Sequence, residues 1–161
     1  MNRDGWFIVG AIIGAIMLTS QLKKTRGMRN NNPGNIRQTS IKWLGEEDYS
    51  TPGVTDDDPS FEEFDTMEYG IRALGRLLRN YQRLYGLETI HQIINRYAPP
   101  HENPTAKYAV SVANKMGVAP ETPINLEDDR NLVELVKAVI WFENGFQPFS
   151  DEFITYSVNI T

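Results

Sequence analysis

Hydrophobic residues recur at helical spacing through the second half of the chain. Apolar side chains follow one another every three or four residues in four segments, and Gly or Pro residues end most of them. This pattern predicts four amphipathic helices, over residues 65–85, 89–97, 103–116 and 132–144. The tail from Phe146 is expected to close against the core of the domain.

Two of these helices begin with a polar pattern that is typical of a helix start. Asp65 is followed three residues later by Glu68, and Thr89 by Gln92. In this arrangement the side chain of the first residue accepts a hydrogen bond from the backbone N–H of the fourth residue. The side chain of the fourth residue accepts one from the backbone N–H of the first. We therefore predict a capping box at each of the two starts.

The last helical segment ends with a carboxylate on its apolar face. In the stretch LVELVKAVIWFENG, Glu143 shares one face with Leu132, Val136, Val139 and Ile140, and a glycine ends the helix two residues later. Burial there would raise the pKa of Glu143 above about 4.3, as a general acid working near neutral pH requires. The alternative is a helix-end Glu that turns to solvent or caps a neighbouring loop.

The first half of the chain shows a different pattern. Residues 26–37 read RGMRNNNPGNIR, a composition that predicts a tightly turned loop rather than a regular helix, with a strand starting near Ile36. Residues 41–64 alternate aromatic residues with turn residues and predict short strands or a hairpin. The acidic side chains between Glu46 and Glu68 are expected to form a solvated face, because EF-hand spacing is absent. Together these features predict a mainly α (α+β) fold with a small β-region.

A long apolar run precedes this domain. Residues 6–18 contain no polar side chain, and residues 6–22 are just long enough to span a bilayer as a helix. Trp6 and a basic cluster flank the run, which predicts one N-terminal transmembrane helix with an N-out, C-in insertion. A cleaved signal peptide is the alternative, but the sequence lacks a small-residue cleavage site. We expect an anchor over residues 1–24 and a single domain over residues 25–161.

Composition excludes several kinds of chemistry. The chain has no cysteine and two histidines without an HExxH motif, which argues against cysteine peptidases and zinc hydrolases; we predict neither a metal nor a cofactor. The net charge is −5, but residues 1–29 hold five basic residues against one acid, so the rest of the chain carries −9. An acidic domain is a poor nucleic-acid binder, so no nucleic-acid partner is expected, and the basic end favours lipid headgroups.

The order of these motifs resembles the lysozyme-like wall hydrolases. Glucosaminidases have an NN-x-x-GI-[KR] turn, then a W-x-G, then an aromatic strand before a helix. This chain has a similar order of segments, in RNNNPGNIR, in Trp43 and Gly45, and in FEEFDTMEYGIRALGRLLRNY. RYAPPHENPTAKYAVSV is similar to the later helices of soluble lytic transglycosylases, and AVIWFENG looks like their catalytic A-I-x-x-E-[ST]-G helix. In those families that helix precedes the NN turn, so the resemblance implies a circular permutation that would place Glu143 against the turn at residues 30–36. The chain also resembles bacteriophage proteins classed as virion structural proteins or peptidoglycan transglycosylases.

The resemblance implies roles for particular residues. Glu143 would be the catalytic acid, with Glu102, in a proline-stiffened loop, as the main rival. Lytic transglycosylases need one Glu, whereas hydrolases need a second carboxylate, for which Asp58, Glu62 and Glu63 are the candidates. The residues expected to bind substrate are Asn31, Asn32, Asn35, Arg37, Trp43, Tyr97 and Asn144.

These observations favour a peptidoglycan-degrading enzyme of a phage virion that cleaves the MurNAc–GlcNAc β-1,4 bond by lytic transglycosylation. Its expected partners are peptidoglycan glycan strands, membrane lipid through residues 6–22, and other virion proteins. The expected location is the virion membrane, from which the domain is delivered to the host cell envelope. The alternatives are a hydrolytic muramidase or glucosaminidase, and a non-enzymatic virion structural protein that only binds the wall.

Overall fold

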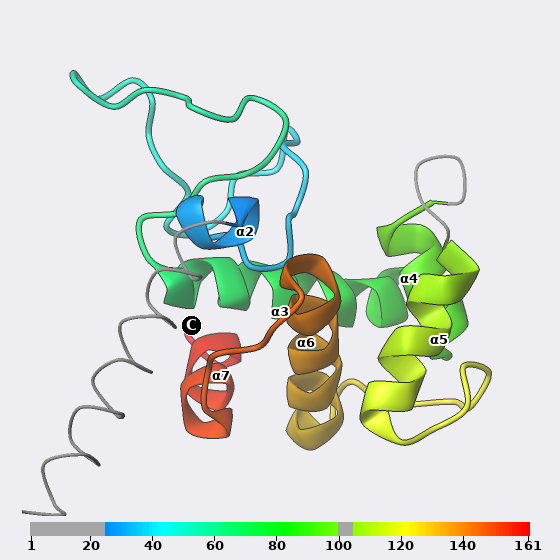
Figure 1. Ribbon diagram of the computed structural model, residues 1–161. Coiled ribbons are helices and arrows are strands. Elements are labelled where there is room, and N and C mark those ends of the chain that lie inside the picture. Colours follow the sequence, from blue (N-terminus) through cyan, green and yellow to red (C-terminus); the bar gives the residue numbers. More distant parts are fainter. Residues whose placement is uncertain (1–24, 100–104) are drawn as a thin grey trace, which may run out of the picture.

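The computed structural model describes residues 25–99 and 105–161. The predicted anchor over residues 6–22 and the rival acid Glu102 lie outside these ranges. Within them, no helix is both long enough and apolar enough to cross a membrane. The helices are α2 (Arg26–Arg29), α3 (Met67–Tyr85), α4 (Ile90–Tyr97), α5 (Thr105–Met116), α6 (Asp129–Asn144) and α7 (Asp151–Val158) (Figure 1).

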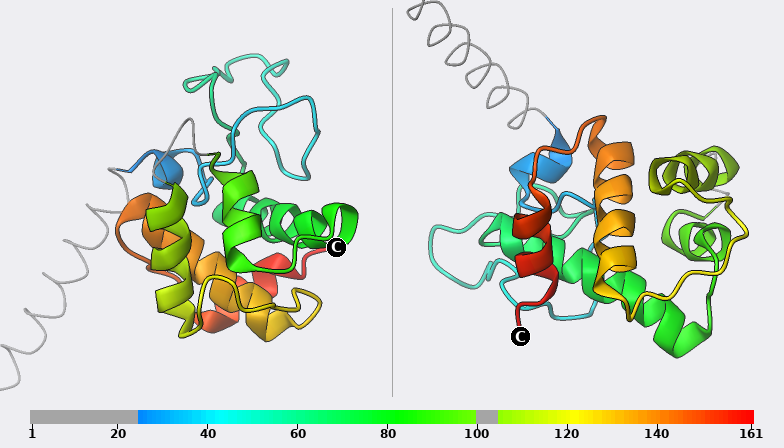
Figure 2. Two further views of the ribbon diagram at one scale, coloured as in Figure 1. Left: turned by 90° about the vertical axis from the view of Figure 1, so that its right-hand side faces the viewer. Right: turned by 90° about the horizontal axis from the view of Figure 1, so that it is seen from below.

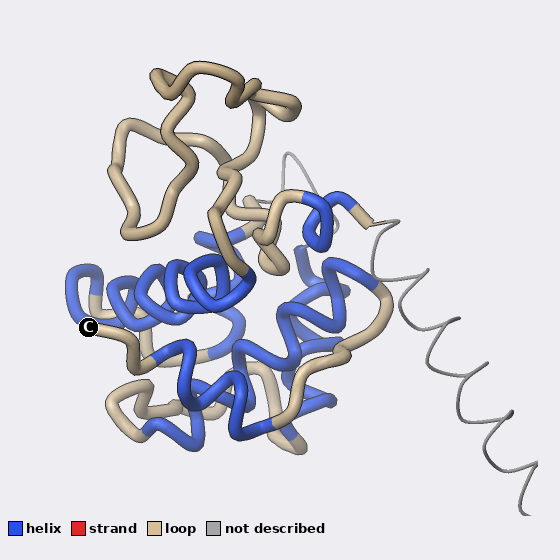
Figure 3. Tube along the Cα trace, turned by 90° about the vertical axis from the view of Figure 1, so that its left-hand side faces the viewer, coloured by secondary structure: helices blue, strands red, loops and turns tan. Residues whose placement is uncertain are grey.

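The prediction of a mainly α fold is confirmed. Helices α3, α4, α5 and α6 correspond to the four predicted segments, and the tube view shows helices joined by loops without strands in the described residues (Figure 3). The capping box at Thr89 and Gln92 is present at the start of α4. The one predicted at Asp65 and Glu68 is wrong, since α3 begins after Thr66 and its N-cap makes no side-chain hydrogen bond.

The predicted β-region is reduced to isolated bridges. Arg37 pairs with Phe61 and Glu46 with Phe64, and neither bridge extends into a strand within the described chain. Backbone pairing persists at single points, since the Glu62 amide donates to the Ile36 carbonyl oxygen at 2.9 Å. The Asn32 amide donates to the carbonyl oxygens of both Ile36 and Glu62, each at 2.9 Å. These side-chain bonds add to the isolated backbone bonds, and together they hold the segment as a loop.

Two short helices were not predicted from the sequence. Helix α2 forms one turn inside the predicted loop, where the Thr25 hydroxyl accepts a hydrogen bond from the Met28 amide. Helix α7 forms in the tail after Ser150 and buries Ile154 and Val158. The tail does close against the core, as expected, but it does so as a helix.

Helix α6 lies at the centre of the helical body. Helix α3 crosses it, α7 and α5 flank it, and α4 packs against α5 (Figures 1 and 2). The apolar faces of these helices form one core. Helix α2 lies beside the C-terminal end of α6, blue against orange in the right view of Figure 2. The end of α6 therefore lies beside the loop region of the chain.

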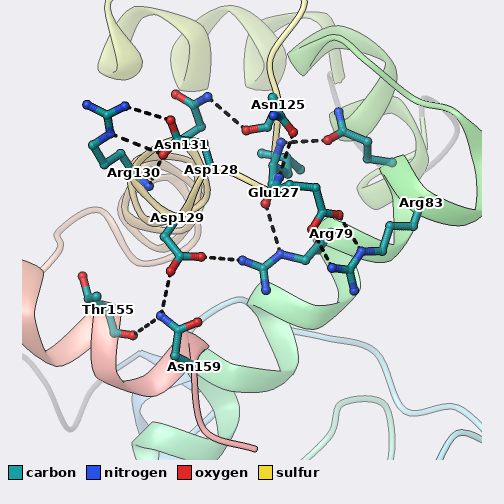
Figure 4. A network of polar contacts seen from close by, with 12 residues as sticks. Arg79, Arg83, Asn125, Glu127, Asp128, Asp129, Arg130, Asn131, Thr155 and Asn159 are labelled. Carbon is teal, nitrogen blue, oxygen red and sulfur yellow. Dashed lines mark hydrogen bonds and ion pairs between the residues drawn. The ribbon is translucent and has the colours of Figure 1, made fainter.

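A polar network holds the opposite end of α6 (Figure 4). Asp129, the first residue of α6, accepts a hydrogen bond from Arg79 of α3 at 2.8 Å and one from Asn159, which follows α7, at 3.1 Å. Arg79 also donates to the backbone carbonyl of Leu126 at 3.0 Å. This network joins three helices at the start of α6.

The loop after α2 docks on the first turn of α3 at a glycine. A Cβ atom placed on Gly70 would lie 1.8 Å from the carbonyl oxygen of Asn31. At Gly75 a Cβ would first meet a methyl group of Val158, at 2.9 Å. The first neighbour is rigid backbone, whereas the second is a side chain that can shift.

We predict that Gly70→Ala destabilises the fold although it adds a better helix former. The gain in helix propensity is about 1 kcal/mol, whereas overpacking costs about 1–3 kcal/mol and here the obstacle is backbone. Chemical denaturation should show a net loss for Gly70→Ala and a smaller loss for Gly75→Ala. Equal stability of Gly70→Ala and the wild type would contradict the close approach.

Candidate active site

Glu143 lies in the last turn of α6, as the sequence predicts. Helix α6 ends at Asn144, and Gly145 follows with a φ of 78°, a left-handed conformation that glycine adopts without strain. Val136, Val139 and Ile140 are buried ahead of the carboxylate. The apolar face of the helix therefore carries Glu143, which is partly buried, to the edge of the core.

The loop between α2 and α3 begins with a turn, residues 30–36, that is held by asparagine side chains. Asn32 is 1% exposed, and its side chain accepts from the Ile36 amide at 2.9 Å while it donates to backbone carbonyls. The Asn31 amide donates to the carbonyl of Phe64 at 2.8 Å. Asn31 and Asn35 have φ values of 48° and 51°, a region that asparagine enters more readily than most residues.

This turn meets the end of α6 through two hydrogen bonds. The Asn35 amide donates to Oε2 of Glu143 at 2.8 Å, across 108 residues of sequence. The Asn144 amide donates to the carbonyl oxygen of Pro33 at 2.7 Å. The predicted contact between Glu143 and the asparagine turn is therefore confirmed.

A tyrosine from α5 holds the other oxygen of the same carboxyl group. The Tyr108 hydroxyl donates to Oε1 of Glu143 at 2.8 Å. Its ring is 2% exposed and stacks on Phe142, with centroids 3.6 Å apart. Tyr97 packs edge-on against Tyr108 and donates its hydroxyl to the carbonyl of Gly34, so both tyrosines connect helices to the region around Glu143.

The environment of Glu143 favours its protonated form. Burial raises the pKa of Glu143, and the hydrogen bonds from Asn35 and Tyr108 lower it by a smaller amount. The negative end of the α6 dipole also disfavours a charge at this position. Burial raises the pKa of Tyr97 and Tyr108 well above 10, so both hydroxyls keep their protons and remain donors.

A groove of about 480 Å³ opens beside this carboxyl group. It brings together five residues that the sequence singled out, namely Asn35, Arg37, Trp43, Tyr97 and Glu143. The other residues in its wall are Arg26, Ile36, Thr39, Ile41, Phe61, Leu77, Tyr81, Arg96, Ala98 and Pro99. The wall therefore combines aromatic rings, arginines and one carboxyl group from the described part of the chain.

Three of the predicted substrate-binding residues, Asn31, Asn32 and Asn144, lie outside the groove wall. The Asn31 amide donates to the carbonyl oxygen of Phe64, and the amides of Asn32 and Asn144 donate to the backbone of the turn and of α6. We assign these three side chains to holding the site together. Glu102 lies outside the described residues.

The candidates for a second carboxylate do not line the groove. Asp58 pairs with Arg26 at 3.1 Å. Glu62 is 1% exposed and accepts a hydrogen bond from the Thr39 amide, while Glu63 accepts one from the Tyr49 hydroxyl. Within residues 25–99 and 105–161, no group of three or more acidic or histidine side chains is arranged to hold a metal ion.

Sequence reasoning missed several residues of the site. Tyr108 looks like an ordinary core residue because it shares a face with Ala109 and Val112. Phe61 and Arg96 reach the groove from separate segments, and only the fold brings them together. The one sequence signal was the tyrosine in AKYAVSV, which lies in the segment that resembles lytic transglycosylases.

Comparison with known proteins gives one clear relationship. No family model matches the chain. It is 42% identical over 155 residues to Protein P5 of Pseudoalteromonas phage PM2, an alignment that spans 93% of this chain and 91% of that protein. The chain belongs to the family of Protein P5. This relationship supports the bacteriophage origin expected from the sequence, while the name Protein P5 states no activity.

The raised pKa of Glu143 predicts how Glu143→Gln changes stability with pH. The folded chain holds this proton more tightly than the unfolded chain, so wild-type stability falls as pH rises from the unfolded pKa, about 4.3, through the raised folded pKa. The glutamine variant lacks this loss. Urea denaturation should therefore show Glu143→Gln gaining stability relative to the wild type between pH 4 and pH 7. If the stability difference between the two proteins stays constant with pH, or changes in the opposite direction, then burial does not raise the pKa of Glu143.

Proposed function

We propose that this protein is a peptidoglycan lytic transglycosylase of a phage virion, with Glu143 as its catalytic acid and base. The observation that carries the proposal is a partly buried carboxyl group with a raised pKa beside a groove, held by Asn35 and Tyr108. A carboxyl group of this kind suits general acid catalysis near neutral pH.

In the first step Glu143 gives its proton to the glycosidic oxygen while the bond from that oxygen to the anomeric carbon breaks. The leaving sugar departs with a free hydroxyl group. The Glu143 carboxylate that remains accepts hydrogen bonds from Asn35 and Tyr108, which offset part of the cost of the new charge.

In the second step the 6-hydroxyl group of the same sugar attacks the anomeric carbon and gives its proton to Glu143. The products are a 1,6-anhydro end and the original protonated carboxyl group, so no water is consumed. This route needs one carboxyl group, and Glu143 is the only carboxyl group that the described residues contribute to the groove wall.

The resemblance to lysozyme-like enzymes supports the same proposal. In a circularly permuted member of that group, the catalytic helix would follow the asparagine turn in the chain and still pack against it. The hydrogen bonds between the turn and the end of α6 fit this arrangement. Trp43, Tyr81 and Phe61 would give the sugar rings apolar surfaces to lie on.

The place of action is part of the proposal. Residues 6–22 would anchor the protein in the virion membrane, and entry would deliver the domain to the host envelope. The apolar run with basic flanks supports this placement, as does the relationship to a phage protein.

One observation favours a second candidate, a non-enzymatic structural protein that binds the wall. Both carboxyl oxygens of Glu143 already accept hydrogen bonds from the protein. Under this candidate the carboxyl group joins the turn to α5 and α6 and transfers no proton. Activity measurements separate this candidate from the enzyme.

We predict that Glu143→Gln abolishes cleavage of purified peptidoglycan while the protein stays folded. Glutamine is close to glutamate in size but cannot transfer the proton, and general acid catalysis is worth roughly 10²–10⁴ in rate. Zymography and muropeptide analysis measure the loss, and a thermal melt checks the fold. The wild-type products should each be lighter by one water than those of a hydrolase.

Two variants serve as controls for this experiment. Glu134→Gln removes a carboxylate from an exposed position on the same helix, where it contacts Lys137, and should keep full activity. The cleavage activity of Glu102→Gln should fall by a few-fold at most. An inactive Glu102→Gln beside an active Glu143→Gln would transfer the role to Glu102, and an inactive wild type would favour the structural protein.

A further inference from the structure

We propose that the groove selects glycans that carry free carboxylates, and that Arg96 is a specificity residue for them. This inference rests on the proposed function, since it names the substrate class of the same groove. It predicts a preference for acidic wall glycan over neutral glycan of the same backbone linkage.

The position of Arg96 suits an anion-binding role. Arg96 is exposed in the last turn of α4 and forms part of the groove wall. Its guanidinium carbon lies 3.5 Å from the ring centroid of Tyr85 and 5.3 Å from that of Tyr81. Among the described residues it forms no ion pair with a carboxylate.

Stacking on a ring orients an arginine without using its hydrogen-bond donors. The guanidinium group presents its N–H donors in its own plane, at the edge, while the aromatic ring contacts its face. Tyr85 and Tyr81 therefore limit the positions of the Arg96 side chain and leave its fork of donors available. Such a fork matches the two oxygens of a carboxylate.

The groove also concentrates positive charge on an acidic protein. The chain has a net charge of −5, yet the described groove wall holds three arginines and one carboxyl group. Arg26 and Arg37 lie over the ring of Phe61, at 4.2 and 5.2 Å from its centroid. Arg26 shares its charge with Asp58, so Arg96 is the arginine on which we base the proposal.

Bacterial wall glycan offers carboxylates from two sources. One is the lactyl group of the muramic acid sugar, which is free where no peptide is attached. The other is the set of side-chain and terminal carboxylates of the stem peptides. Chitin oligosaccharides share the β-1,4 linkage and have neither. The chemistry that Arg96 would recognise, a carboxylate beside the sugar chain, is common to both sources.

The test measures binding of the full chain carrying Glu143→Gln, so that cleavage does not consume the ligand. Sedimentation assays compare three preparations of one peptidoglycan. These are intact material with stem peptides, material stripped of peptides by an amidase, and intact material whose carboxylates have been converted to neutral amides. We expect at least one of the acidic preparations to bind at least about fivefold more tightly than the neutral one, and this preference should weaken as salt increases.

Arg96→Gln is the decisive variant, and Arg130→Gln is its matched control. Arg130 is exposed at the other end of α6, thirteen residues before Glu143, or about 20 Å along the helix, and its removal changes the net charge equally. Arg96→Gln should weaken binding to the acidic glycan by about two- to fivefold, the size of an exposed ion pair, and leave binding to the neutral glycan unchanged. Arg130→Gln should change binding to neither glycan, and the two variants should have the same melting temperature.

The outcomes separate this inference from the proposed function. If the wild type cleaves acidic and neutral glycans equally well, the proposed function stands and the proposed selectivity is contradicted. If the chain prefers acidic glycan through Arg96 but cleaves no glycan, the proposed selectivity stands and the proposed enzymatic activity is contradicted. Equal losses for Arg96→Gln and Arg130→Gln would show an effect of net charge alone and contradict the role of Arg96.

Discussion

The contact between the asparagine turn and the end of α6 is the constraint on which the site depends. Asn35 donates to the Glu143 carboxyl group, and Asn144, the next residue after Glu143, donates back to the turn at Pro33. These two bonds join segments more than 100 residues apart, so the rest of the fold must hold both segments still. Removing either amide would leave a polar group without its partner near the core, which is costly.

The fold meets this requirement from both ends of α6. At its start, Asp129 links α6 to α3 and to the end of α7. At its end, the loop packs on Gly70 of α3 with no room for a Cβ atom. The carboxyl group of Glu143 is therefore held at the edge of the groove, where it is poorly solvated and two donors fix its orientation.

The sequence was informative where local pattern decides structure. Helical spacing placed Glu143 at the end of its helix, and the RNNNPGNIR composition indicated a tight turn. The contact between the two was implied by the family resemblance. The predicted strands are reduced to isolated bridges, and the Asn32 side chain adds hydrogen bonds to the Ile36 and Glu62 carbonyl oxygens, which hydrophobic alternation does not reveal. Tyr108 and Arg96 could not be assigned to the site from sequence, since their roles arise from how α4, α5 and α6 meet.

The most direct test of the account is the pH dependence of cleavage in an Asn35→Gly variant. Glycine keeps the left-handed backbone at this position, where φ is 51°, and removes the amide that lowers the pKa of Glu143. If Glu143 is the proton donor, its pKa should rise further, and the alkaline limb of kcat/KM on peptidoglycan should shift to higher pH. An alkaline limb at the same pH as in the wild type would show that another group donates the proton.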